Sequence, residues 1–168
     1  TAIAGLGGSV AYARNRIGQG LLQWGPRETA AAFAKEALSH YVAPDNPSGM
    51  AWSRMLLGQI EQHDANYEEA KKHFREGLEG YLAVGHRDGV SWAMNMMAKV
   101  AKFRGDFLAA EQMLLEALLI EEEISNYAAQ AWTQVALGEV ECLLGRLEKA
   151  DKYLLCAWEM YTQMGDKA

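Results

Sequence analysis

The stretch from residue 91 to residue 124 reads SWAMNMMAKVAKFRGDFLAAEQMLLEALLIEEEI and decides the fold. It predicts two amphipathic helices joined by a turn at Gly105-Asp106, because apolar residues recur at helical spacing on both sides of that glycine. The sequence matches itself at a constant shift, and the clearest mark of this period is a column of aromatic residues: Tyr12, Trp52, Trp92 and Trp132. A fixed period in this range predicts a solenoid, in which each unit covers the apolar face of the next.

Two columns of small residues repeat at the same period and predict where the helices touch. On the first helix of each repeat they are Gly18, Gly58, Ala98 and Gly138. On the second helix they are Ala30, Ala70, Ala110 and Ala150. Small side chains let two helices approach closely, and a larger one there costs about 1–3 kcal/mol. The residues before the first column are expected to point inward: Ile17, Leu57, Met97 and Leu137.

Helix start and stop signals divide the chain into four repeats within one domain, residues 1–168. The predicted repeats span residues 9–41, 48–85, 88–124 and 127–165, and residues 1–5 are interpreted as the tail of a preceding helix. Gly7-Gly8-Ser9 is predicted to be a turn, with Ser48 and Asp88 as helix caps. Because both ends of the chain fall inside the repeat, we expect it to be a fragment of a longer protein.

The repeats resemble the tetratricopeptide repeat. The residues that carry the resemblance are Leu57-Gly58, Ala70, Phe74 and Gly77, and again Leu137-Gly138, Ala150, Leu154 and Ala157. The resemblance covers almost the whole chain and implies an all-α, right-handed superhelical solenoid of four helix-turn-helix repeats. The period departs from the family, at about 40 residues rather than about 34. This longer variety, closest at residues 91–98, is similar to repeats in the sensor regions of large bacterial transcriptional regulators.

The resemblance implies that the first helices line a concave surface that binds a protein or peptide segment. Aromatic anchors beside amides suit such a partner, since aromatic residues supply most hot-spot energy. The candidate contacts on this face are Tyr12, Asn15, Gln19, Trp52, Met55, Gln59, Gln62, His63, Trp92, Asn95, Lys99, Lys102, Phe103, Trp132 and Glu139. The family's clamp for a C-terminal carboxylate is not expected, because its basic residues are missing at the matching positions: Asn15, Gln19, Leu56, Trp92 and Met96.

Several of these candidates have a second interpretation. The tryptophans either anchor a partner or fill space between repeats, as large aromatic residues at helical spacing usually do. Asn15 and Asn95 are either groove contacts or simply solvent-exposed, because asparagine has poor helix propensity and its presence needs a reason. Lys99 and Lys102 either hold an acidic group of the partner or are ordinary solvated lysines.

Composition restricts the remaining functions. The net charge of −6 and the pI near 5.2 argue against direct nucleic-acid binding. No apolar run is long enough to cross a membrane, and two cysteines fit a reducing, cytoplasmic location. The sequence holds no phosphate loop, zinc helix or C-x-x-C pair, so no cofactor or metal is expected. Glu121-Glu122-Glu123 is interpreted as a solvated helix end.

These observations predict a non-catalytic binding scaffold, the interaction or sensor module of a larger bacterial regulatory protein. The alternative is a structural spacer that self-associates into a homo-oligomer through uncapped ends. A third class, an enzyme built on a helical bundle, is not expected, because no catalytic constellation is found.

Overall fold

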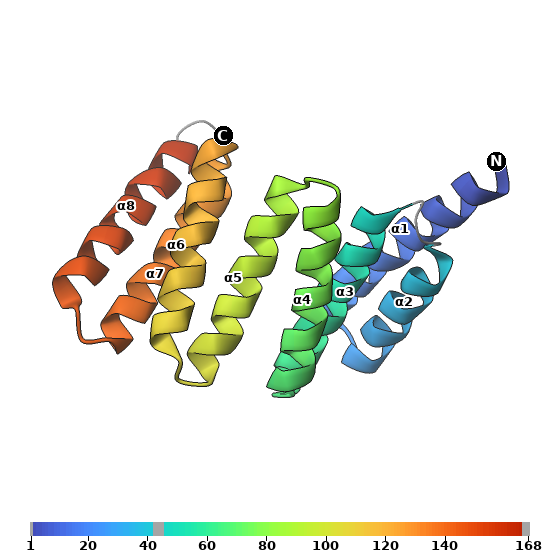
Figure 1. The fold of residues 1–168 in the computed structure, drawn as a ribbon, viewed down its shortest axis with the longest axis horizontal. Coiled ribbons are helices and arrows are strands. Elements are labelled where there is room, and N and C mark those ends of the chain that lie inside the picture. Colours follow the sequence, from blue (N-terminus) through green and yellow to red (C-terminus); the bar gives the residue numbers. More distant parts are fainter. Residues whose placement is uncertain (1, 42–45, 166–168) are drawn as a thin grey trace. The chain divides into compact units, whose positions relative to one another are not determined.

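The computed structural model describes residues 2–41 and 46–165, with side chains from residue 8 onward. Within these ranges it consists of eight α-helices and contains no strand (Figure 1). The predicted all-α helical repeat solenoid is confirmed. The helices are α1 (Ala2–Trp24), α2 (Arg27–His40), α3 (Pro47–His63), α4 (Tyr67–Ala83), α5 (Arg87–Phe103), α6 (Phe107–Glu123), α7 (Tyr127–Leu143) and α8 (Leu147–Gly165).

The helices form two compact units, residues 1–86 and residues 87–168. Each unit contains two helical hairpins: α1–α2 and α3–α4 in the first, and α5–α6 and α7–α8 in the second (Figure 1). Inside a unit each helix packs against the next one in sequence. The first helices of the two hairpins also touch, α1 against α3 and α5 against α7. Each unit therefore has a face built from two first helices.

The turns from α3 onward recur at an even spacing, and each holds one residue with positive φ: Ala65, Gly85, Gly105, Ser125 and Gly145. Glycine adopts this conformation without the Cβ clash that an L side chain meets there. The N–H of the following residue then reaches back to a carbonyl in the last turn of the helix, as from Asn126 to Glu121 at 2.9 Å. This pattern satisfies the last carbonyls of the helix. The helices α3 to α7 consequently all have 17 residues.

The small-residue columns lie where the helices touch. Ala30, Ala70 and Ala110 are 0% exposed and Ala150 is 1% exposed, as predicted. A Cβ added to Gly58 would lie 2.5 Å from Cε1 of Phe74, so the aromatic ring occupies the space that the glycine leaves. Glycine is needed here for close approach, because no side chain fits between the helices.

One expectation about the core is wrong at the first repeat. Leu57 and Leu137 are 4% and 0% exposed, whereas Ile17 is 48% exposed. The reason is that this position packs toward the preceding repeat: Leu57 joins a core cluster with Ala30 and Ala34 of α2. No helix of a preceding repeat lies over α1 within the described residues, so Ile17 faces outward.

Three predicted helix boundaries are also wrong. The helix α1 continues through Gly7-Gly8-Ser9, because a glycine inside a helix costs only about 1 kcal/mol relative to alanine and does not by itself end it. The cap of α3 is Asn46, whose Oδ1 accepts a hydrogen bond from the Gly49 N–H at 2.8 Å, and Ser48 lies inside the helix. Asp88 lies in the first turn of α5 rather than at its cap.

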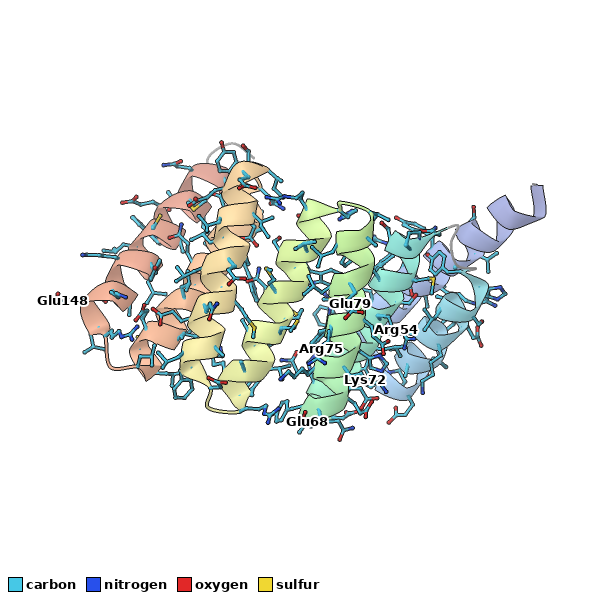
Figure 2. The ribbon with its side chains drawn as sticks, in the orientation of Figure 1. Arg54, Glu68, Lys72, Arg75, Glu79 and Glu148 are labelled. Atoms are coloured by element: carbon cyan, nitrogen blue, oxygen red, sulfur yellow. The ribbon has the colours of Figure 1, made fainter. Side chains whose placement is uncertain are left out.

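The exposed face of α4 carries a stripe of acidic and basic side chains. Its members, labelled in Figure 2, are Glu68, Lys72, Arg75 and Glu79. The opposite face of α4 buries Ala70, Phe74, Gly77 and Tyr81. This division is the pattern of a surface helix with one face in the core. None of the described helices combines the length and hydropathy needed to cross a bilayer.

Candidate functional site

The second unit has a hollow of about 250 Å³ on the face of α5 and α7, which we name the α5–α7 groove. Its apolar lining comes from Ala98, Leu114, Val135, Ala136 and Val140. Five of the residues predicted from the sequence also line it: Asn95, Lys99, Lys102, Trp132 and Glu139. Residues that lie far apart in the sequence meet here because the first helices of successive hairpins pack side by side.

The charges of the α5–α7 groove are only partly neutralised. Lys102 Nζ donates a hydrogen bond to Glu139 Oε2, and it also lies 5.8 Å from the centre of the Phe103 ring. Lys99 is half-buried one helical turn away and has no ion-pair partner among the described residues. Trp132 remains 39% exposed. The groove thus combines an apolar lining, an aromatic side chain and one cation without a countercharge.

The two asparagines make buried hydrogen bonds between helices. Asn95 is 4% exposed, and its Nδ2 donates to Glu121 Oε1 and to Thr133 Oγ1, both at 2.9 Å. Asn15 is 0% exposed and donates to Ser53 Oγ at 2.9 Å. Their interpretation as solvent-exposed residues is therefore wrong, whereas Asn95 lines the α5–α7 groove and its contact with a partner stays a prediction. A buried amide needs internal partners, and a hydroxyl 38 positions further on supplies one in each unit.

A second hollow in the same unit has a volume of about 370 Å³, and we name it the Glu121 pocket. It is lined by Asp88, Ser91, Trp92, Asn95, Met96, Glu121, Ala129 and Trp132. Glu121 is 0% exposed, so its interpretation as part of a solvated helix end is wrong. The last turn of α6 is covered because Asn95 on α5 and Gln130 on α7 both donate hydrogen bonds to Glu121.

The environment of Glu121 changes its acidity. Burial raises the pKa of Glu121 above the ordinary value of 4.5, and the charge of Asp88 raises it further. The polar side chains of Thr133, Asn95 and Ser91 act in the opposite direction but do not cancel the effect of burial on this pKa. A carboxyl group with a raised pKa holds its proton in the folded chain at a pH where the unfolded chain has released it.

This shift predicts a pH-dependent stability. Because the folded protein binds the extra proton, its free energy of unfolding should fall as pH rises from about 4.5 through the folded pKa of Glu121. Glu121→Gln keeps the acceptor for Asn95 but cannot ionise, so the variant should lose less stability over this window. Urea denaturation of both proteins at about pH 5 and about pH 8 measures the difference. Equal losses of stability between the two pH values in both proteins would contradict a raised pKa of Glu121.

The first unit has a hollow of about 290 Å³ that contains two further predicted contacts, Tyr12 and Trp52. Their ring centroids are 5.4 Å apart, so the aromatic rings pack on each other while they line the hollow. The tryptophans at 52 and 92 are half-buried, which leaves both of their interpretations open.

The remaining predicted contacts are scattered. Met55 is 0% exposed and Gln62 is 8% exposed, so neither is available as a direct contact. Gln19 and Gln59 are half-buried, whereas His63 and Phe103 are exposed. Within the described residues no three His, Cys, Asp or Glu side chains are grouped as metal ligands would be.

Comparison with known proteins agrees with this architecture. Residues 49–120 match the sequence profile of the tetratricopeptide repeat. Over this stretch, which is less than half of its length, the chain is similar to the tetratricopeptide-repeat family. Tetratricopeptide repeats generally serve as scaffolds for protein interaction rather than as catalysts. A search of curated protein sequences finds no match.

Solved structures with the same fold show how widely this arrangement occurs. BtubC from P. vanneervenii is 20% identical with a TM-score of 0.79, and the match covers 92% of this chain and 64% of that one. Aspartyl phosphate phosphatase F from Bacillus subtilis is 14% identical with a TM-score of 0.86, over 93% of this chain and 41% of that one. A putative kinesin light chain with TPR-like repeats from Podosopora anserina is 12% identical with a TM-score of 0.72, over 90% of this chain and 75% of that one. The present chain thus spans less than two thirds of BtubC and of the phosphatase.

Sequence reasoning missed Glu121, although a signal was present. The repeat period places it in a column with Tyr41, Tyr81 and Tyr161, where it is the only acidic member. Tyr41 and Tyr81 are buried, at 5% and 4% exposed. Tyr161, in the last repeat of the described residues, is 46% exposed, so the signal for a buried acid at Glu121 comes from the two tyrosines before it.

Proposed function

We propose that this tetratricopeptide array is a non-catalytic scaffold that binds a protein or peptide segment in the α5–α7 groove. The observation that carries the proposal is the meeting of the exposed Trp132 ring, an apolar lining and the unpaired Lys99 in one hollow. Aromatic side chains next to an apolar pocket are typical anchors of protein interfaces.

The groove favours a partner with a particular chemistry. The apolar lining accepts a side chain such as leucine or tryptophan, and Lys99 attracts an acidic side chain next to it. Lys102 contributes less to this attraction, since Glu139 already neutralises it. We infer a segment that places an apolar residue beside a glutamate or an aspartate.

The wider context of this proposal is regulatory. We infer that the array is the interaction or sensor module of a larger bacterial regulatory protein, active in the cytoplasm without direct contact to nucleic acid or membrane. The support is the long repeat period and the similarity of residues 91–98 to regulator repeats, together with the net charge of −6.

Charge reversal at Lys99 tests the groove. The probes are fluorescein-labelled peptides in which leucine or tryptophan is followed by glutamate, and fluorescence anisotropy gives their Kd. Lys99→Glu should raise the Kd of the best-binding peptide about three- to tenfold, with a smaller effect at high salt. Lys152→Glu on α8 makes the same charge change at an exposed lysine outside the groove and should change the Kd by less than about twofold. Equal effects of the two substitutions, or no binding by any peptide, would reject the groove.

Self-association is a second candidate, favoured by the outer face of α8. Large apolar side chains are exposed there: Leu147, Leu155, Trp158 and Tyr161. A second copy of the chain could cover this face in a homo-oligomer. Sedimentation equilibrium over a range of concentrations should then show a dimer that Trp158→Glu dissociates, and a monomer at every concentration would rule this function out.

A further inference from the structure

The hollow of the first unit and the Glu121 pocket occupy the same place in two copies of one arrangement. A shift of two repeats along the sequence brings their lining into register. The matching pairs are Gly8 with Asp88, Tyr12 with Trp92, Tyr41 with Glu121, Gly49 with Ala129, and Trp52 with Trp132. The aromatic walls are kept in both copies, so the difference between them lies in the other positions.

That difference is two acidic side chains. The first copy has glycine and tyrosine where the Glu121 pocket has Asp88 and Glu121. No lysine or arginine lines the Glu121 pocket to offset the two acids. Asp88 is exposed, and its Oδ1 accepts a hydrogen bond from Asn126 Nδ2 at 2.6 Å. The pocket is therefore an acidic hollow with tryptophan in its walls.

One oxygen of Glu121 is buried without a partner. The side chain is 0% exposed and Oε1 accepts from Asn95, but Oε2 makes no hydrogen bond. The nearby hydroxyls are already used, since Thr133 donates to Asn95 Oδ1 at 3.3 Å and Ser91 donates to the Asp88 carbonyl at 3.1 Å. A buried polar atom without a partner is unfavourable, and native structures contain few of them. A donor brought by a ligand would satisfy this oxygen.

The walls of the pocket suit the same kind of ligand. Trp92 and Trp132 both line it, and indole is the aromatic group that attracts cations most strongly. A carboxylate beside aromatic side chains suits an organic cation, whose charge contacts the ring faces and whose N–H groups donate to the carboxylate. The absence of a metal-ligand cluster among the described residues agrees with an organic ligand.

We propose that the Glu121 pocket binds an organic cation, a guanidinium or alkylammonium group whose N–H donates to Glu121 Oε2 while Asp88 supplies a second negative charge at the rim. The group belongs either to an arginine or lysine side chain of a peptide or to a free small amine. The pocket volume of about 370 Å³ lies within the ordinary range of ligand pockets. Asn95 and Trp132 line both hollows, but this inference needs no partner in the α5–α7 groove.

Isothermal titration calorimetry on the whole chain tests the inference. The probes are agmatine, the peptide acetyl-Gly-Arg-Gly-amide, and the same peptide with citrulline, which keeps the shape of arginine but not its charge. We expect at least one of the two cations to bind and the citrulline peptide not to bind. Binding of agmatine alone identifies a free amine as the source, and binding of the arginine peptide alone identifies a side chain.

Two variants and a matched control locate the binding. Glu121→Gln should lower the affinity for the cation at least tenfold, and circular dichroism checks that the variant folds. Asp88 is exposed, and Asp88→Asn keeps the oxygen that accepts the hydrogen bond from Asn126. This variant should weaken binding of the cation severalfold, and it serves as the test even if Glu121→Gln is unstable. Glu122→Gln makes the same change at the adjacent exposed glutamate and should leave the affinity unchanged. Failure of both cations to bind, or equal affinity in all the variants, would overturn the proposal.

Discussion

Phe74→Ala should lower the free energy of unfolding by about 3–5 kcal/mol. The Phe74 side chain is 0% exposed, and its ring fills the gap that Gly58 leaves between α3 and α4. Truncation removes this apolar surface from the core and leaves a cavity that the two helices cannot close without moving. Urea denaturation followed by circular dichroism measures the loss.

Leu154→Ala is the matched control for this prediction. Leu154 occupies the same column two repeats later, one helical turn after the buried Ala150, and its side chain also lies beside a glycine, Gly138. It is 38% exposed, so its truncation removes less buried surface and opens no closed cavity. We expect less than half of the loss seen for Phe74→Ala. Equal losses at the two positions would contradict the central role of Phe74 in the first unit.

Gly58→Ala should destabilise the protein by about 1–3 kcal/mol, although alanine has the higher helix propensity. Its Cβ would lie 2.5 Å from Phe74 Cε1 and 2.6 Å from Cδ1, so the ring or the helix must shift. Gly20→Ala is the control, since a Cβ at Gly20 in α1 meets nothing within 4 Å. That variant should gain about 0.5–1 kcal/mol, because only the propensity changes. Urea midpoints of the two variants should therefore move in opposite directions.

The clash at Gly58 can be separated from other effects of the substitution. In a background where Phe74 is leucine, the smaller side chain leaves room for the added methyl group. Gly58→Ala should then cost less than it does beside phenylalanine, and the double-mutant cycle measures the coupling. Purely additive effects would show that the ring is not the obstacle.

The repeat period predicted the fold, because it reports on packing between neighbours that every repeat must satisfy. The alanine column shows this directly: the same contact recurs in each hairpin, so four weak signals agree. Single helix boundaries were less predictable. The three residues Gly7-Gly8-Ser9 have the composition of a turn, yet α1 passes through them, since a modest propensity penalty is smaller than the gain from a continuous helix.

The candidate site was predicted in part. Lys99, Lys102, Trp132 and Glu139 were placed on one face, and they do line one hollow, because helical spacing alone fixes the face. The roles of Asn95 and Glu121 were not predictable from one helix. Each is buried by the other and by Thr133, which lies 38 positions beyond Asn95 on a third helix. Burial at a helix end depends on which helix covers it, and no local pattern reports that.

The asparagine–hydroxyl pair has a consequence for how such an array changes length. Asn15 bonds Ser53 of the next repeat, and Asn95 bonds Thr133 of the next repeat. Between these two pairs, the equivalent positions are Met55 and Ala93, which form no such hydrogen bond. Deletion of one repeat would place Ala93 opposite Asn15. Alanine offers no side-chain hydrogen bond, so the buried amide would lose its partner. Excising two repeats would restore a hydroxyl opposite it, at Thr133. Deletion of two hairpins should therefore preserve this buried hydrogen bond, whereas deletion of a single hairpin should lose it.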